Sequence, residues 1–95
     1  MTQRQKVINV LRQNRKSVAG FGVKRLGVFG SFARDEAKAS SDLDFVVEFE
    51  KKTFDAYMGL KIYLEELFHR PVDLVTRDSI KPRLRETILK ETVYA

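Results

Sequence analysis

The sequence predicts an α/β fold of the α+β kind, in which residues 1–95 form one domain built on a small β-sheet flanked by helices. Three observations predict this class. Residues 42–49 alternate strictly in side-chain character, as a half-buried strand does. Shorter apolar runs at 24–29 and 72–76 are bounded by turn residues. Apolar residues recur at helical spacing around these runs, so helices and strands alternate.

The N-terminal segment predicts a helix, a strand and a second helix. Apolar residues recur at helical spacing over residues 2–18, and two glycines end this amphipathic helix. The run 24–29 is stopped by a tight turn at Gly30 and Ser31. Residues 31–39 contain good helix formers, so a short helix follows.

The strongest strand signal covers residues 42–49, where successive side chains point to opposite faces. One face carries Leu43, Phe45, Val47 and Phe49, and the other carries Asp42, Asp44, Val46 and Glu48. The two aspartates therefore share one face of the strand.

A second long helix is predicted over about 53–68, with Thr53 or Asp55 able to cap its start. His69 follows the helix, just before Pro71. Because the chain has no second histidine for a metal pair, a surface or capping role is favoured over catalysis for His69.

The C-terminal part predicts a strand at 72–76 and a last helix that Asp78 or Ser79 caps and that runs to about Val93. The sheet then has three strands or slightly more. The phenylalanines fall mostly at periodic apolar positions, which favours core packing over base stacking: Phe21, Phe29, Phe32, Phe45, Phe49, Phe54 and Phe68.

Composition places the chain among ordinary globular proteins, with 43% hydrophobic and 33% charged residues. It has no cysteine, which excludes disulfides and thiolate metal sites and fits a reducing, cytoplasmic location. The N-terminus lacks the continuous apolar run of a signal peptide, and no stretch approaches the ~20 apolar residues that span a bilayer.

The net charge of +5 is unevenly distributed, because residues 1–29 hold seven lysines or arginines and no acid. Such a segment could meet nucleic acid, an acidic protein or nucleotide phosphates. A solvated helix face explains it equally well, because no aromatic residue among these bases is placed to stack on nucleotides.

Three aspartates on predicted strands are the candidate catalytic and metal-binding residues. Asp42 and Asp44 project from one face and repel each other, a penalty that a divalent cation such as Mg²⁺ removes. Asp73 lies in an otherwise apolar strand, and it converges with them if the two strands are neighbours. Three such carboxylates can hold two metal ions ~3.5–4 Å apart for displacement at phosphorus.

Gly30 and Ser31 supply a candidate nucleotide-binding turn. A glycine between strand and helix lets backbone N–H groups approach phosphate, and a serine hydroxyl can donate to it. Carboxylates and turn together describe a site for a metal-chelated nucleoside triphosphate. Each part alone has another reading, since the turn could be a helix cap, the Asp-x-Asp pair could be solvated, and Asp73 could pair with Arg77 or Arg34.

The spacing of these residues resembles a known family. Gly30-Ser31-Phe32-Ala33-Arg34 is followed by Asp42-Leu43-Asp44, with ten residues between Ser31 and Asp42, and later by Val72-Asp73-Leu74-Val75. This pattern is similar to the signature of the minimal nucleotidyltransferases (MNT proteins) of the DNA polymerase beta superfamily. The resemblance covers about residues 22–93 and implies a nucleotidyltransferase fold with a mixed sheet.

The resemblance also implies a mechanism and a partner. Asp42 and Asp44 would bind two Mg²⁺ ions, with Mn²⁺ as a possible substitute, and Asp73 would share the catalytic metal and help deprotonate the nucleophile. Gly30 and Ser31 would hold the triphosphate of ATP. Members of the family are commonly encoded beside a HEPN-domain RNase and act as its antitoxin by adenylylating a tyrosine of that toxin.

Two positions qualify this resemblance. Many relatives have glycine where this chain has Asp35, whose charge we expect to point away from the site. Arg34 is a candidate nucleotide-binding residue that either neutralises phosphate charge or pairs with a site carboxylate.

An alternative function from another class is a non-catalytic antitoxin subunit that binds and masks its partner, with apolar Val93 and Tyr94 as an exposed interface. The complete set of aspartates favours the enzyme. Nucleic-acid binding through the basic N-terminal segment is the least supported hypothesis, and assembly into a homo-oligomer stays open.

Overall fold

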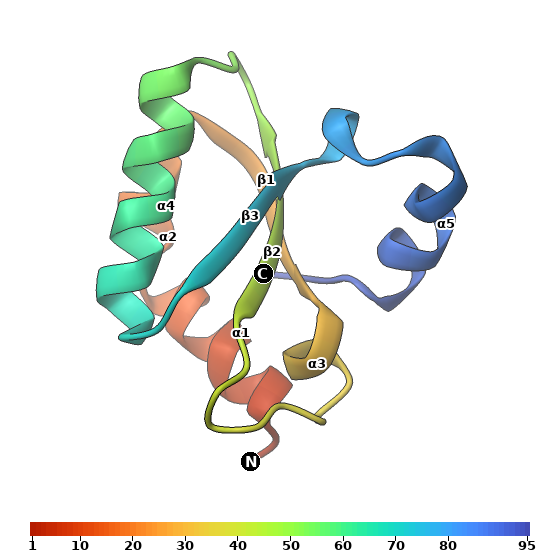
Figure 1. Cartoon of the computed structure of the whole chain (residues 1–95). Coiled ribbons are helices and arrows are strands. Elements are labelled where there is room, and N and C mark those ends of the chain that lie inside the picture. Colours follow the sequence, from red (N-terminus) through yellow and green to blue (C-terminus); the bar gives the residue numbers. More distant parts are fainter.

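The computed structural model describes residues 1–95 as a four-stranded sheet with helices packed on both faces (Figure 1). The elements in chain order are α1 (Gln3–Gln13), α2 (Arg15–Ala19), β1 (Val23–Phe29), α3 (Gly30–Ala33), β2 (Leu43–Phe49), α4 (Phe54–Phe68), β3 (Val72–Thr76), the 3₁₀ helix η1 (Arg77–Ser79), α5 (Pro82–Glu91) and β4 (Val93–Tyr94). None of these helices is long and apolar enough to cross a membrane.

The strands lie in the order β3-β2-β1-β4. β1 pairs antiparallel with β2 and with β4, whereas β2 and β3 are parallel and are joined by the crossover helix α4. The sheet is therefore mixed, which confirms the fold class predicted from the sequence.

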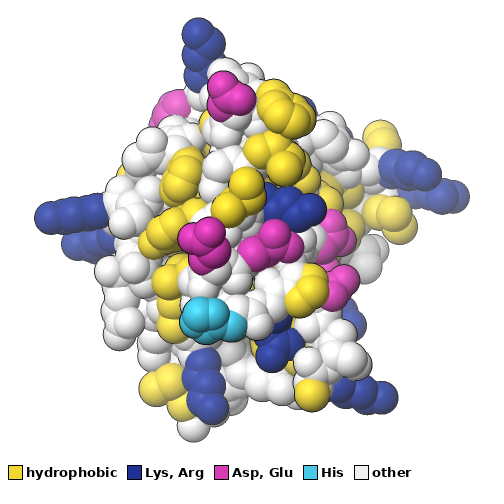
Figure 2. All heavy atoms as spheres, turned by 60° about the vertical axis from the view of Figure 1, so that its left-hand side comes forward, with side chains coloured by type: hydrophobic (Ala, Val, Ile, Leu, Met, Phe, Trp, Pro, Cys, Tyr) yellow, Lys and Arg dark blue, Asp and Glu magenta, His cyan; other side chains and the backbone are white.

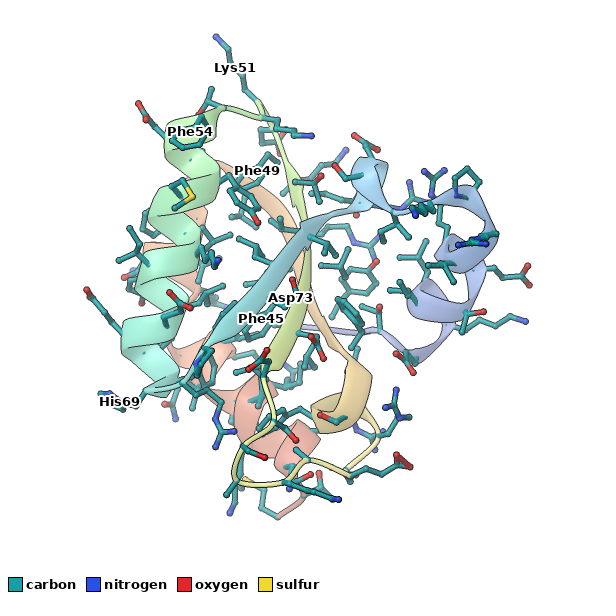
Figure 3. All side chains as sticks on the ribbon, viewed as in Figure 1. Phe45, Phe49, Lys51, Phe54, His69 and Asp73 are labelled. Carbon is teal, nitrogen blue, oxygen red and sulfur yellow. The ribbon has the colours of Figure 1, made fainter.

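One face of the sheet carries the main hydrophobic core. Leu43, Phe45 and Val47 of β2 are fully buried there against Leu60 and Leu64 of α4, and α1 and α2 add further apolar side chains. Figure 3 shows the Phe45 side chain on the side of the sheet that faces α4. The predicted alternation of β2 explains this packing, because its odd-numbered residues all point into the core.

The other face is covered only in part. Asp44 and Asp73 project on this face, next to the short helix α3, and α5 packs beside them. Val46 lies on this face too and is buried, although it is not part of the main core. No side chain of α5 is fully buried, so α5 lies outside the main core.

The predicted helix over 2–18 is wrong in one respect, because it breaks at Asn14 into α1 and α2. The Asn14 side-chain amide donates to the Val10 carbonyl oxygen (2.8 Å), so this side chain competes with the helical hydrogen bonds of the backbone. The end at Gly20 agrees with the prediction.

The predicted helix over 31–39 is also too long, because α3 ends at Ala33. Asp35 follows with a φ of 59°, in the left-handed region that ends a helix. Glycine adopts this conformation without strain, and aspartate tolerates it better than most other residues, so either residue suits this position.

Helix α4 agrees with its prediction at both ends. The Thr53 hydroxyl oxygen accepts from the Ala56 N–H (3.0 Å) at the start, and His69 stands at the C-cap with a left-handed φ of 56°. The capping role predicted for His69 is thus confirmed, at the end of α4 in Figure 3. Phe54 is an exception to the predicted core phenylalanines, since 77% of it is exposed.

The C-terminal prediction is wrong in two respects. Asp78 and Ser79 belong to η1 and do not cap α5, which starts at Pro82 after Lys81. Proline at a first helical position fits because its missing N–H has no intrahelical partner there. Val93 and Tyr94 are not a free interface, because they form β4 and pair with β1.

Candidate active site

The parallel pairing of β2 with β3 brings the candidate carboxylates together. Asp44 is the direct register partner of Asp73, so the two side chains emerge side by side from the same face of the sheet. Asp42 lies two residues before Asp44, just ahead of β2. Asp42 and Asp73 are exposed and Asp44 is half-buried. Asp73 was predicted to join the site only if its strand lay next to the strand of Asp44, and this adjacency is confirmed.

Uncompensated negative charge dominates this site. The pKa of Asp44 is raised from its ordinary value of 3.8 to about 6, first by burial and then by the charges of Asp73, Asp42 and Glu91, in that order. Arg34 opposes them only weakly. None of the ion pairs of the structure includes Asp42, Asp44 or Asp73, so the alternative pairing of Asp73 with an arginine is not formed.

The Gly30 turn is part of the same site. Gly30 has a φ of 72°, and a Cβ atom built on it would collide with the Asp44 carboxylate. Only glycine lets the turn and the carboxylate approach this closely. The anion-binding turn and the aspartates that sequence spacing connected are therefore in direct contact, with Ser31 as the next residue of the turn.

Glu91, at the end of α5, is a member of the site that sequence reasoning missed. Its Oε1 accepts from the Gly30 N–H (3.0 Å), and its Oε2 accepts from Arg34 Nη1 (2.9 Å). Arg34 also donates through Nε to Glu36 (3.1 Å), and these hydrogen bonds, that to Glu91 first, raise the pKa of Arg34. No local sequence pattern links Glu91 to a turn some sixty residues earlier.

Arg70 is a second residue that was missed. Its guanidinium donates to the Ser41 carbonyl oxygen (2.9 Å) and lies 4.8 Å from the centre of the Phe32 ring. One side chain from the loop before β3 therefore connects the segments that carry Ser31 and Asp42. Arg70 positions these segments, and its hydrogen bond goes to a backbone oxygen and not to a candidate catalytic group.

Asp35 points away from the aspartates, as predicted. Its Oδ1 accepts from the Arg4 N–H (2.9 Å) at the start of α1. Asp35 is also not among the charges that raise the pKa of Asp44. The departure from the family pattern at this position thus leaves the charge of the site unchanged.

The donor set fits a hard divalent cation. Asp42, Asp44 and Asp73 offer oxygen ligands only, and a cation would relieve both causes of the raised pKa of Asp44, its burial and the repulsion from Asp73 and Asp42. No three acidic side chains are yet gathered closely enough to hold a metal ion. Asp44 and Asp73 are register partners and Asp42 lies two residues before Asp44, so side-chain rotation can bring their carboxylates closer together.

A groove of about 760 Å³ lies beside this site and not in it, since none of the three aspartates lines it. It follows β3 past Val75, between the start of α4 and α5, with exposed Phe54 and Leu84 among its lining.

Figure 2 shows acidic side chains near the middle of one face of the molecule and most lysines and arginines projecting at its margin.

A mixed sheet that brings a Gly-Ser turn against adjacent strand carboxylates is the arrangement expected of an enzyme that transfers nucleotides. The family model described as "Nucleotidyltransferase domain" matches residues 4–95, and the chain belongs to this family.

Individual relatives agree with this assignment. The chain is 45% identical over 75 residues to the protein adenylyltransferase MntA of Thermococcus cleftensis, covering 78% of this chain and 76% of MntA. A solved structure assigned as a minimal nucleotidyltransferase superposes with a TM-score of 0.76 at 42% identity, over 90% of this chain and 93% of that one.

A more distant structure shares the fold. It is a complex of a tri-AMPylated HEPN toxin from Shewanella oneidensis with an MNT antitoxin, with a TM-score of 0.58 at 22% identity. The match covers 97% of this chain and 67% of that chain.

The raised pKa of Asp44 makes a prediction about stability. Because the folded state holds this proton more tightly than the unfolded state, stability falls as pH rises from about 4 through about 6. Asp44→Asn should therefore stabilise the metal-free protein at pH 7 by roughly 1–2 kcal/mol, allowing for solvent screening of a half-exposed group. Urea unfolding measures this, and the difference should shrink as the pH falls through 3.8, the ordinary pKa at which the unfolded state also takes up the proton. Equal stability at pH 7 would contradict the raised pKa of Asp44.

Proposed function

We propose that the protein is a Mg²⁺-dependent protein adenylyltransferase that moves AMP from ATP to a tyrosine of a HEPN toxin and thereby acts as its antitoxin. The observation that carries this proposal is the contact between the Gly30 turn and Asp44, which itself pairs with Asp73. The adenylyl group and the protein acceptor are inferred from the name of the 45% identical relative. A HEPN toxin is proposed as the partner because a HEPN toxin is bound to the MNT antitoxin whose structure shares this fold.

Asp42, Asp44 and Asp73 would hold the metal ions. When bound, Mg²⁺ supplies charge neutralisation and Lewis acidity at the reacting phosphorus. The Gly30 N–H, the Ser31 hydroxyl and the Arg34 guanidinium would donate to phosphate oxygens. These donors restrain the triphosphate next to the carboxylates.

The transfer itself breaks one bond and forms one. The acceptor oxygen bonds to the α-phosphorus, the bond from this phosphorus to the oxygen bridging to the β-phosphate breaks, and pyrophosphate leaves. Asp73 is exposed and adjacent to Asp44, so its carboxylate is placed to take the proton of the incoming hydroxyl.

The test uses ATP labelled at the α- or at the γ-phosphate, with Mg²⁺ and a HEPN-domain toxin from the same organism as acceptor. Label at the α-phosphate should appear on the HEPN protein, label at the γ-phosphate should not, and a tyrosine-to-phenylalanine acceptor should stay unlabelled. Transfer of γ-label would indicate a kinase, and transfer of neither label would contradict the proposed reaction.

The groove along β3 favours a second function, that of a subunit which inhibits its partner by binding alone. Exposed Phe54 and Leu84 are apolar side chains of the kind that protein partners bury. Under this alternative, a variant with all three aspartates replaced by asparagine still neutralises the toxin in cells. Under the proposed reaction, this variant loses neutralisation while it still binds the toxin.

A further inference from the structure

The Glu91 carboxylate holds two of the donors that the proposed function assigns to phosphate. One oxygen accepts from the Gly30 N–H at 3.0 Å, and the other accepts from Arg34 Nη1 at 2.9 Å. A phosphate group binds to N–H donors in the same way, through two anionic oxygens that each accept a hydrogen bond. In the absence of nucleotide, the site therefore already contains an anion supplied by the chain.

The charge of Glu91 extends to the candidate metal ligands. It is one of the charges that raise the pKa of Asp44, and the Arg34 guanidinium is shared between Glu91 and Glu36. A triphosphate that enters while Glu91 stays in place meets a fourth carboxylate beside three aspartates. Like charges in such proximity repel, so the two anions exclude each other from these donors.

The position of Glu91 in the fold allows its side chain to move away from Gly30 and Arg34. It is the last residue of α5, a helix without a fully buried side chain, and its own side chain remains 25% exposed. The following strand, β4, is two residues long. Because part of this side chain reaches solvent at the end of the helix, rotation of the Glu91 side chain alone can release Gly30 and Arg34.

We propose that Glu91 is an internal competitor for the nucleotide: its carboxylate occupies the triphosphate donors Gly30 N–H and Arg34 until ATP displaces it. This inference rests on the proposed function, because it takes the phosphate-binding role of Gly30 and Arg34 from there. ATP then binds only to the fraction of molecules in which Glu91 has released Gly30 and Arg34. The apparent affinity for ATP is therefore lower than the affinity of the released site, by the factor of that fraction.

Binding of the non-hydrolysable analogue AMP-PNP with Mg²⁺, measured by calorimetry on the whole chain, tests the proposal. Glu91→Gln keeps the size of the side chain and removes its charge, whereas Glu91→Ala removes both contacts. We expect both variants to bind AMP-PNP roughly fivefold to tenfold more tightly than the wild type. Circular dichroism before each titration establishes that the variants are folded. If Glu91→Ala does not fold, the comparison of Glu91→Gln with the wild type is sufficient for the test.

Glu86→Gln is the matched control, because Glu86 lies on the same helix, is 79% exposed and pairs only with Lys90. It loses the same charge away from the site and should leave the dissociation constant unchanged. If the wild type binds AMP-PNP and Glu91→Gln binds it no more tightly, the competitor role of Glu91 is contradicted, whereas the proposed function is not. No binding by the wild type or either variant contradicts the proposed function as well.

Discussion

Replacing Asp42 and Asp44 together by asparagine should reduce AMP transfer to the HEPN protein by at least about a thousandfold. Asparagine keeps the shape of each side chain but removes two of the three charges that would hold Mg²⁺. Initial rates of α-label transfer at saturating ATP measure this loss. Because the substitutions also remove repulsion around Asp44, the double variant should be at least as stable as the wild type.

This combination of higher stability and lost activity separates catalysis from folding. A control with Asp55→Asn and Asp78→Asn removes the same charge at exposed positions outside the site and should transfer AMP normally. Transfer by the Asp42/Asp44 variant within tenfold of the wild type would exclude these aspartates from the reaction.

Gly30→Ala should be the most damaging single substitution in the nucleotide-binding turn. The new methyl group would occupy the position of the Asp44 carboxylate, at a backbone φ of 72° that L-residues rarely adopt. We expect a loss of about 1–3 kcal/mol in the free energy of unfolding and a loss of about a hundredfold or more in transfer rate. Urea unfolding and the label-transfer assay measure the two effects.

Gly22 provides the control for backbone strain. Its φ is 79°, but a Cβ atom there meets nothing within 4 Å. Gly22→Ala should therefore cost a similar amount of stability while leaving transfer of AMP close to that of the wild type. If Gly22→Ala and Gly30→Ala reduced transfer equally, contact with Asp44 would not be the cause of the Gly30 effect.

Local sequence patterns predict most of the sheet and α4 because their determinants are local. The alternation of β2 and the capping residue Thr53 each involve neighbours within a few positions, and both predictions are confirmed. The break at Asn14 depends on one side-chain hydrogen bond that competes with the helix. The strand β4 has only two residues and exists because β1 offers it a partner, so no local periodicity could indicate it.

The residues of the site also divide into those that local sequence patterns predict and those that only the fold reveals. Asp42 and Asp44 are predictable from alternation, and the family spacing connects them to Gly30. Pairing between Asp44 and Asp73 needs the parallel register of two strands that are separated by α4. Glu91 and Arg70 reach the site from distant segments through single side chains, so only the folded chain shows them.

One measurement asks whether these segments form a single metal–nucleotide site. Mn²⁺ with AMP-PNP, added to isotopically labelled protein, broadens the NMR signals of amides near the bound ion. Broadening is expected first at Gly30 and Ser31, at Asp42 to Asp44 and at Asp73, and the Asp42/Asp44 variant should lose it. Broadening confined to other segments, such as the basic residues of α1 and α2, or broadening that persists in the variant, would contradict a site formed by these residues.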